Sequence, residues 1–187
     1  MVDTAKPMRA DARRNYERLM DQARAAFAER GTEASLEDIA GAAGVGIGTL
    51  YRHFPTRQDL LEALLREQFD ALAATGRDLL DDVSAGAALV TWVSAFVAMT
   101  STYRGLTAAL TATLRDESTT LHAACVSMRA VATALLERAQ QAGAVRADVS
   151  ASDFLILISG VAWAYEHVVE ESPRRLLDLV FEGLVER

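Results

Sequence analysis

Apolar residues recur every three or four positions along most of the chain, the spacing that places them on one face of an α-helix. The pattern is clear near the N-terminus, where Leu19, Ala23 and Phe27 share one face and the opposite face is charged. No segment alternates apolar and polar residues at every second position with turn residues between, so no β-sheet is expected. The pattern therefore predicts an all-α fold.

Signals for helix starts and stops divide the chain into about nine helices. Three starts carry a capping box, in which a Ser or Thr hydroxyl can accept a hydrogen bond from the amide of an acid three residues later. These boxes are Ser35 with Asp38, Thr56 with Asp59, and Ser150 with Asp153. Glycines that can adopt a left-handed conformation are expected to end helices at Gly31, Gly44 and Gly143. The expected helices are 12–30, 36–43, 47–54 and 56–74, with five more beginning near residues 78 or 85, 104, 117, 152 and 173.

Two of these helices are short, and a tight turn joins them. Residues 36–43 and 47–54 flank Gly44-Val45-Gly46 and follow the longer first helix. Two short helices joined by a glycine-containing turn form the helix-turn-helix arrangement, whose second helix enters the major groove of DNA. We therefore expect a three-helix helix-turn-helix DNA-binding domain over residues 1–55 and a second helical domain over residues 56–187, connected by the helix from residue 56.

Charge is distributed unevenly along the chain. The 187 residues are 51% apolar and 24% charged, the balance of a folded protein. A net charge of −7 would, taken alone, argue against a polyanionic partner such as DNA. However, residues 1–66 hold ten Lys and Arg and ten Asp and Glu, so the whole deficit lies in residues 67–187. The acidic total therefore does not exclude DNA; it predicts binding through a few placed cations, which salt weakens easily.

The signals for cellular compartment favour the cytoplasm. The single cysteine, Cys125, cannot form an internal disulfide, and the N-terminal residues lack the basic and apolar pattern of a secretion signal. Residues 83–103 carry no charged side chain, but Ser and Thr interrupt them and Arg104 follows. A membrane-spanning helix is therefore not expected there.

The segment from Ser35 to Leu61 resembles the DNA-binding signature of TetR-family transcriptional regulators. It reads SLEDIAGAAGVGIGTLYRHF followed by PTRQDLL. The resemblance is strong over about the first 65 residues, and beyond them it concerns only length and helical character. It implies a ligand-binding and dimerisation domain over residues 56–187, and hence a near-palindromic operator. Gly46 departs from the family pattern, which commonly has Ser or Thr, so one side-chain phosphate contact and one helix cap are lost there, and backbone amides are the alternative donors.

The resemblance assigns DNA contacts to the second short helix and its surroundings. The expected DNA-binding residues are Ile47, Gly48, Thr49, Tyr51, Arg52, His53 and Arg57. Four of them, at positions 47, 48, 49 and 52, are expected at the bases, where an arginine suits guanine and an apolar group suits the thymine methyl. The other three can donate hydrogen bonds to phosphates. A plainer interpretation treats Tyr51 and Phe54 as core aromatics and His53 as an ordinary surface histidine.

Two sets of large apolar residues are candidates for regulation. Ligand cavities are mostly apolar, and the expected lining comprises Trp92, Phe96, Met99, Tyr103, Leu110, Met128 and Trp163. The last two helices carry apolar stripes that the resemblance places at the dimer interface. These stripes comprise Phe154, Ile158, Val161, Tyr165, Leu177, Val180, Phe181 and Leu184. For both sets the plainer interpretation is that they pack the core of the protomer.

Signals of catalysis and metal binding are weak. Gly44–Thr49 lacks the last glycine of a dinucleotide-binding fingerprint, and no strand precedes it. His122 and Cys125 share one helix face without further thiols nearby, which favours a small buried thiol and an ordinary histidine. We therefore expect no catalytic residue, no metal, no cofactor and no enzymatic activity.

The leading hypothesis is a homodimeric transcriptional repressor that binds double-stranded DNA and is released from it by a small apolar effector. The alternative is a small-molecule-binding or protein-interaction module whose helix-turn-helix has lost its function on DNA. The N-terminal residues Lys6, Arg9, Arg13 and Arg14 either form a basic arm on the DNA or a solvated end of the chain.

Overall fold

The computed structural model describes residues 5–103, 105–167 and 173–184, and regular structure within these ranges is entirely helical. The described helices are α1 (Ala5–Arg30), α2 (Leu36–Ala42), α3 (Ile47–His53), α4 (Arg57–Leu79), α5 (Ala85–Thr102), α6 (Leu106–Ala109), α7 (Thr111–Arg115), α8 (Thr120–Gln141), α9 (Ala151–His167) and α10 (Pro173–Leu184). The expected all-α class is confirmed. The helix expected from residue 104, itself outside the described residues, is divided at Leu110 into α6 and α7. None of the described helices is long and apolar enough to cross a membrane.

The capping signals in the sequence all act as expected. The hydroxyl oxygen lies 3.1 Å from the amide nitrogen in each box, Ser35–Asp38, Thr56–Asp59 and Ser150–Asp153. In the second box the bond is reciprocal, because the Thr56 amide also donates to Asp59 Oδ2 at 2.8 Å. Left-handed φ values of 71°, 66° and 69° occur at Gly31, Gly44 and Gly143, within two residues of the ends of α1, α2 and α8.

The chain forms two compact units. The N-terminal unit comprises Met1–Leu65 with Tyr103–Thr111, and the C-terminal unit comprises Arg66–Thr102 with Ala112–Arg187. α4 begins in the first unit and continues into the second, so this one helix belongs to both.

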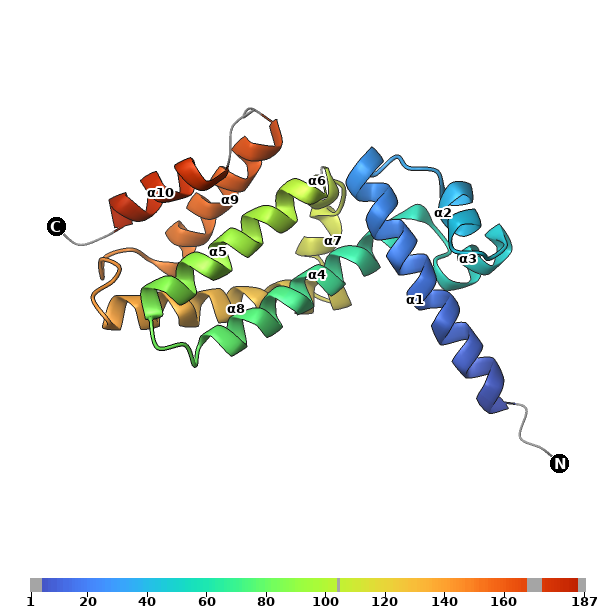
Figure 1. Ribbon diagram of the computed structural model, residues 1–187, viewed down its shortest axis with the longest axis horizontal. Coiled ribbons are helices and arrows are strands. Elements are labelled where there is room, and N and C mark those ends of the chain that lie inside the picture. Colours follow the sequence, from blue (N-terminus) through green and yellow to red (C-terminus); the bar gives the residue numbers. More distant parts are fainter. Residues whose placement is uncertain (1–4, 104, 168–172, 185–187) are drawn as a thin grey trace. The chain divides into compact units, whose positions relative to one another are not determined.

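In the N-terminal unit, α1 packs against α2 and α2 packs against α3. Figure 1 shows this group in blue and teal, with the first turns of α1 extending past α2 and α3. The interior of the unit includes Leu19, Phe27, Ile39, Leu50 and Leu60, each at most 2% exposed. These residues come from α1, α2, α3 and α4, so four helices share one small core.

α5 is the central helix of the C-terminal unit, because it contacts α8, α9 and α10 (Figure 1). On α5, Trp92 is fully buried; its indole Nε1 donates to the Leu72 carbonyl of α4 at 3.0 Å, and its ring stacks on Phe96. A β-carbon added at Gly76 of α4 would lie 2.3 Å from Val131 Cγ1 of α8 and 2.9 Å from the Trp92 ring. Only glycine at this position allows α4 to approach both neighbouring side chains so closely.

Candidate DNA-binding surface

α2 and α3 are joined by a turn that depends on Gly44. Its φ of 66° is left-handed, and its amide donates to the Gly41 carbonyl at 3.0 Å. The next amide, of Val45, donates to the Ala40 carbonyl at 3.0 Å, which completes the end of α2. The chain is therefore redirected into α3 within a few residues, and the expected helix-turn-helix is confirmed.

α3 leaves most of its surface uncovered. Leu50 is the buried residue among its seven. The remaining six residues are all expected DNA contacts: Ile47 (36% exposed), Gly48 (exposed), Thr49 (half-buried), Tyr51 (43% exposed), Arg52 (exposed) and His53 (half-buried). A β-carbon added at Gly48 would meet no atom within 4 Å, so the backbone there is open to close approach. A helix held by one buried side chain offers its remaining faces to a partner.

Three aromatic rings fix the C-terminal end of α3. Tyr16 of α1 lies 5.3 Å from Phe54 and 6.0 Å from His53, measured between ring centroids. Phe54 is 3% exposed and belongs to the core, as its plainer interpretation predicts, whereas Tyr51 is exposed and does not. The half-buried His53 ring is thus held against α1 and keeps part of its surface for solvent.

Arg57 is engaged inside its own unit. The guanidinium Nη1 donates to the Thr32 carbonyl at 2.8 Å and to the Ala34 carbonyl at 2.5 Å, and the side chain is half-buried. It therefore ties the connection between α1 and α2 to the start of α4. The expected phosphate contact of Arg57 stays a prediction; the sequence alone could not show these two carbonyl partners.

Arg52 contrasts with Arg57. It is exposed, and in the described part of the chain no carboxylate lies within ion-pair distance of it. Its position in the last turn of α3 places an uncompensated positive charge at the end of the helix-turn-helix.

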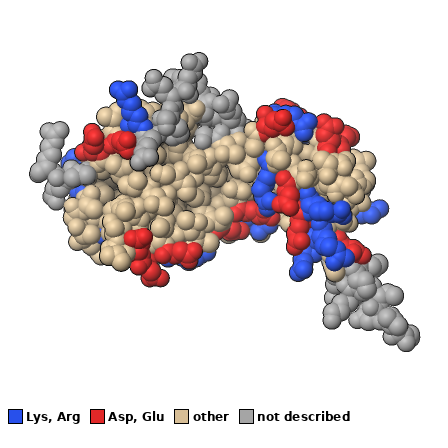
Figure 2. Space-filling view, in the orientation of Figure 1, with Lys and Arg blue, Asp and Glu red and all other residues tan. Residues whose placement is uncertain are grey.

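Other charges of the N-terminal unit largely compensate one another. On α1, Arg14 pairs with Asp11, Arg13 with Glu17, and Arg24 with Asp21. Figure 2 shows the result as basic and acidic side chains mixed over this unit. Such exposed pairs contribute about 0–1 kcal/mol each, so a stronger anion can displace the carboxylates. The side chains of Lys6 and Arg9 lie outside the described residues.

The seven residues expected around a ligand do not share one environment. Trp92, Phe96, Met99 and Met128 are buried in the C-terminal unit, at most 8% exposed. Tyr103 and Leu110 belong to the N-terminal unit. Burial raises the pKa of the Tyr103 hydroxyl, and the positive charge of nearby Arg24 partly opposes this shift. Trp163 is 57% exposed, which places it on the surface of α9.

The expected dimer stripes face inward. Phe154 and Ile158 are fully buried, and Val161, Tyr165, Leu177 and Leu184 are at most 9% exposed, while Val180 and Phe181 are half-buried. Residues buried within one protomer have little surface left for a second, so the plainer interpretation holds for most of this set. The sequence reasoning missed the opposite face, where Ile156, Leu157, Trp163 and Leu179 are 40–68% exposed. Their helical spacing was visible, but both faces of α9 are apolar and spacing alone cannot say which face is inside.

The pair at His122 and Cys125 has a structural explanation. His122 Nδ1 lies 2.8 Å from the Leu114 carbonyl oxygen, so this nitrogen carries the proton. Burial raises the pKa of the half-buried Cys125 thiol. Among the described residues, no group of three or more His, Cys, Asp or Glu side chains could hold a metal ion.

Two family descriptions match the chain. "Bacterial regulatory proteins, tetR family" matches residues 19–64, and "Transcriptional regulator SbtR-like, C-terminal domain" matches residues 84–186. The first covers the helix-turn-helix and the start of α4, and the second covers α5 to α10.

Individual relatives agree. The HTH-type transcriptional repressor KstR2 of Mycobacterium tuberculosis is 42% identical over 67 residues, 35% of this chain. The chain covers only about a third (34%) of the length of KstR2. A TetR transcriptional regulator from Streptomyces coelicolor is 33% identical with a TM-score of 0.69, covering 90% of this chain and 97% of its own. A TetR transcription regulatory protein from Mycobacterium vanbaalenii is 32% identical with a TM-score of 0.71, covering 96% of this chain and 100% of its own. The chain therefore belongs to the TetR family of transcriptional regulators, whose members act by binding DNA and not as enzymes.

Proposed function

We propose that this protein is a cytoplasmic, homodimeric transcriptional repressor that binds a near-palindromic operator and is released by a small apolar molecule. The observation that carries the proposal is α3, which buries only Leu50 and leaves the rest of its surface open within an otherwise packed helix-turn-helix. Residues 1–55 form the DNA-binding domain of this proposal and residues 56–187 its ligand-binding and dimerisation domain, with α4 connecting them.

The DNA contacts divide between bases and phosphates. Ile47, Gly48, Thr49 and Arg52 face the base edges, because they lie on the open side of α3. Tyr51 and His53 donate to phosphates. Arg57 supports DNA binding indirectly, since it holds the connection that precedes α2.

Dimerisation rests on the outer face of the last two helices. On α9, Ile156, Gly160 and Trp163 follow one another at four and three residues, the spacing of a single face. Large exposed apolar groups that lie together mark interaction surfaces, and a β-carbon added at Gly160 would meet nothing within 4 Å, so a partner helix could approach closely there. On α10, Leu179 is 56% exposed, and α10 contacts α9. A twofold dimer presents two copies of α3, which requires two half-sites of opposite orientation.

The effector is assigned to the buried apolar groups of the C-terminal unit. These groups are Phe96 and Met99 of α5 and Met128 of α8, on two helices that contact each other. Aromatic rings and flexible methionine side chains are typical of apolar ligand sites. The Trp92 indole is less suited to anchor a polar group of the effector, because its Nε1 already donates to the Leu72 carbonyl. A ligand that favours one arrangement of the protomers lowers operator affinity by population shift.

The test of DNA binding is a gel shift and footprint on the DNA flanking the protein's own gene. We expect a salt-sensitive, sequence-specific complex. Arg52→Ala should remove about 1–3 kcal/mol of preference at one base pair, whereas Arg129→Ala, at an exposed arginine of α8, should leave the preference unchanged. Equal affinity for operator and random DNA would favour the alternative, a binding module with an inactive helix-turn-helix.

Dimerisation is tested by sedimentation of single-site variants. Ile156→Asp places a charge on the proposed interface and should yield monomers. Val126→Asp is the matched control, because Val126 is a 52% exposed apolar residue on α8. If both variants or neither lose the dimer, the outer face of α9 is not the interface.

Release by an effector is tested first with stearoyl-CoA, whose apolar acyl chain stands in for the proposed apolar effector, because FadR from Bacillus subtilis was crystallised in complex with it. A ligand of the proposed kind raises the unfolding temperature and lowers operator affinity together. A ligand that stabilises the protein without changing operator affinity would contradict the regulatory link.

A further inference from the structure

The turn between α2 and α3 has no polar side chain of its own. From Ile39 to Gly48 the sequence is IAGAAGVGIG, ten residues without a hydroxyl, amide or charge. The N-cap of α3 is Gly46, which makes no side-chain cap hydrogen bond. A DNA strand passing this edge of the helix-turn-helix would therefore find no phosphate-binding side chain in the turn.

Arg18 of α1 reaches this turn from outside it. Its Nη1 lies 3.5 Å from the position that a β-carbon on Gly44 would occupy, and its side chain is exposed. Two residues earlier on α1, Tyr16 contacts His53 at the other end of α3. α1 therefore has one side chain at the last residue of α3, Tyr16, and another, Arg18, at the turn before its first.

Arg18 differs from the other arginines of α1 in its partner. Its Nη2 donates to Asn15 Oδ1 at 2.5 Å, a neutral amide. Among α1 arginines with described side chains, the others pair with carboxylates. The positive charge of Arg18 is therefore left uncompensated, as is that of Arg52.

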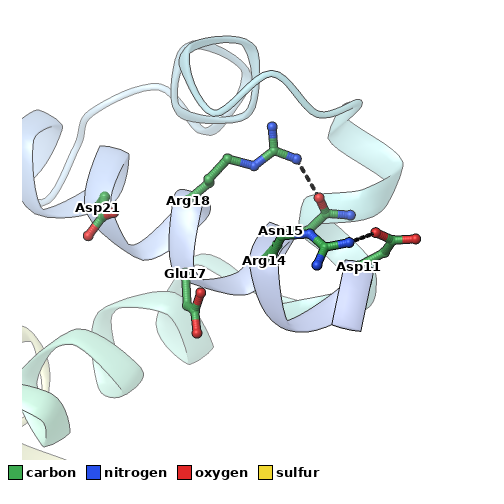
Figure 3. Close-up of a pocket in the computed structure, with 6 residues that line it drawn as sticks. All are labelled: Asp11, Arg14, Asn15, Glu17, Arg18 and Asp21. Atoms are coloured by element: carbon green, nitrogen blue, oxygen red, sulfur yellow. Dashed lines mark hydrogen bonds and ion pairs between the residues drawn. The ribbon is translucent and has the colours of Figure 1, made fainter. Parts of the chain in front are cut away.

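The surroundings of Arg18 form an open hollow of about 700 Å³ along α1 (Figure 3). It is lined by Asp11, Arg14, Asn15, Glu17, Arg18 and Asp21. Each of the three acids is paired with another arginine, at positions 14, 13 and 24. Figure 3 also shows the Arg18 guanidinium extending towards Asn15, away from Glu17 and Asp21. The acids of the hollow therefore do not neutralise it.

We propose that Arg18 binds an operator phosphate beside the α2–α3 turn and supplies, from α1, the contact that the side chains of the turn cannot make. This inference rests on the proposed DNA-binding function and adds a positioning residue outside the helix-turn-helix. A guanidinium suits this role because it is permanently charged and presents several N–H donors to phosphate oxygens. Contact with a phosphate positions the protein without reading sequence.

The experiment measures operator affinity as a function of salt for the full-length protein. Each neutralised phosphate contributes about −0.9 to the slope of log K against log salt concentration. A dimer carries two copies of Arg18, so Arg18→Gln should reduce the slope by about 1.8. Between 50 and 200 mM salt, the variant should then lose about twelvefold less affinity than the wild type. Arg18→Lys keeps the charge and should keep most of the slope.

Arg129→Gln is the control, because Arg129 is an exposed arginine on α8, outside every proposed DNA contact. It should leave the slope at the wild-type value. Ethylation of operator phosphates provides a second readout: one phosphate in each half-site should block the wild type when ethylated and no longer matter to Arg18→Gln. Preference among operator variants should be unchanged.

The outcomes separate the two proposals. A wild-type protein that binds the operator specifically, together with Arg18→Gln at the wild-type slope and ethylation pattern, overturns the role of Arg18 alone. An equal fall in slope for Arg129→Gln also overturns it, because the effect would then be one of general charge. A wild-type protein without specific DNA binding overturns both.

Discussion

α3 and α5 show how differently the two units hold a helix. α3 contributes only Leu50 to an interior, and its position is set by the Gly44 turn before it and the aromatic rings after it. α5 contacts α4, α8, α9 and α10, and its residues Leu89, Trp92, Val93 and Val97 are all fully buried. Since buried apolar area contributes about 25 cal/mol per Å², packing along its length accounts for α5, whereas α3 is held at its two ends, by the Gly44 turn and by the contact of Tyr16 with Phe54.

The contrast teaches where each unit can tolerate change. A helix that is held at its two ends can leave the surface between them free for DNA. A helix surrounded by others has no such freedom, and substitutions along it act on stability first. Four experiments test this contrast.

The largest effect is expected at Gly76. Gly76→Val would place its β-carbon 2.3 Å from Val131 Cγ1 and 2.9 Å from the Trp92 ring, and neither neighbour can rotate away easily. We expect a loss of about 3 kcal/mol in the free energy of unfolding, the upper end of overpacking costs. Gly41→Ala in α2 is the matched change, because a β-carbon there meets nothing within 4 Å. It should stabilise by about 0.5–1 kcal/mol. Chemical denaturation measures both, and a change of the same sign at both glycines would remove the contrast.

The next effect is expected at Arg57. Arg57→Met keeps the apolar stem but loses the hydrogen bonds to the Thr32 and Ala34 carbonyls. Because hydrogen bonds to charged groups contribute about 1.5–3 kcal/mol and this side chain is half-buried, we expect a loss of about 2 kcal/mol in the absence of DNA. Thermal unfolding without DNA and the salt dependence of operator binding separate the two roles. Unchanged stability with a smaller salt slope would favour the expected phosphate contact over the structural role.

Local signals explain why the N-terminal unit could be predicted in detail. The capping boxes at Ser35 and Thr56 and the left-handed Gly44 each act within four residues, so their geometry is written in the sequence. Even there, the prediction was wrong in extent for α1, which begins at Ala5, seven residues before its expected start. The hydrogen bonds of the Arg57 side chain were not predicted either, because the two carbonyl groups that accept them lie 23 and 25 residues away in the sequence.

The C-terminal unit was predicted as a set of helices but not as an arrangement. α9 is apolar on both faces, so spacing identified Phe154 and Ile158 as a stripe without showing that they face inward. α8 begins at Thr120 and not near residue 117, because the Thr119 hydroxyl caps it by accepting a hydrogen bond from the His122 amide at 3.0 Å. No acid stands three residues after Thr119, so the sequence carried no capping-box signal there. The proximity of Gly76 to Trp92 depends on how α4 and α5 pack, which no local pattern records.

A smaller effect is expected at Trp92. Trp92→Phe keeps an aromatic ring but removes the bond from Nε1 to the Leu72 carbonyl. We expect a loss of about 1.5 kcal/mol, because the hydrogen bond contributes about 1 kcal/mol and the smaller ring leaves a gap. Fluorescence tests the burial directly: the variant retains only Trp163, which is 57% exposed, so emission should shift to the red. In Trp163→Phe the remaining emission should be blue-shifted, and identical spectra from the two variants would contradict the assigned environments.

The smallest effect is expected at the two serine caps, where the units can be compared by the same substitution. Ser35→Ala and Ser150→Ala each remove a hydroxyl oxygen that accepts a hydrogen bond from a backbone amide nitrogen 3.1 Å away. Each should lower the free energy of unfolding by about 1 kcal/mol. Their effects on the operator should differ. α2 has only seven residues and leads through the Gly44 turn into α3, so fraying at Ser35 should weaken DNA binding in addition to stability. α9 has 17 residues and packs against α5, so it should keep its position without its cap. Gel shifts with both variants at matched folded fraction make the comparison. If Ser35→Ala weakens operator binding no more than Ser150→Ala, long-range packing and not local signals positions α3.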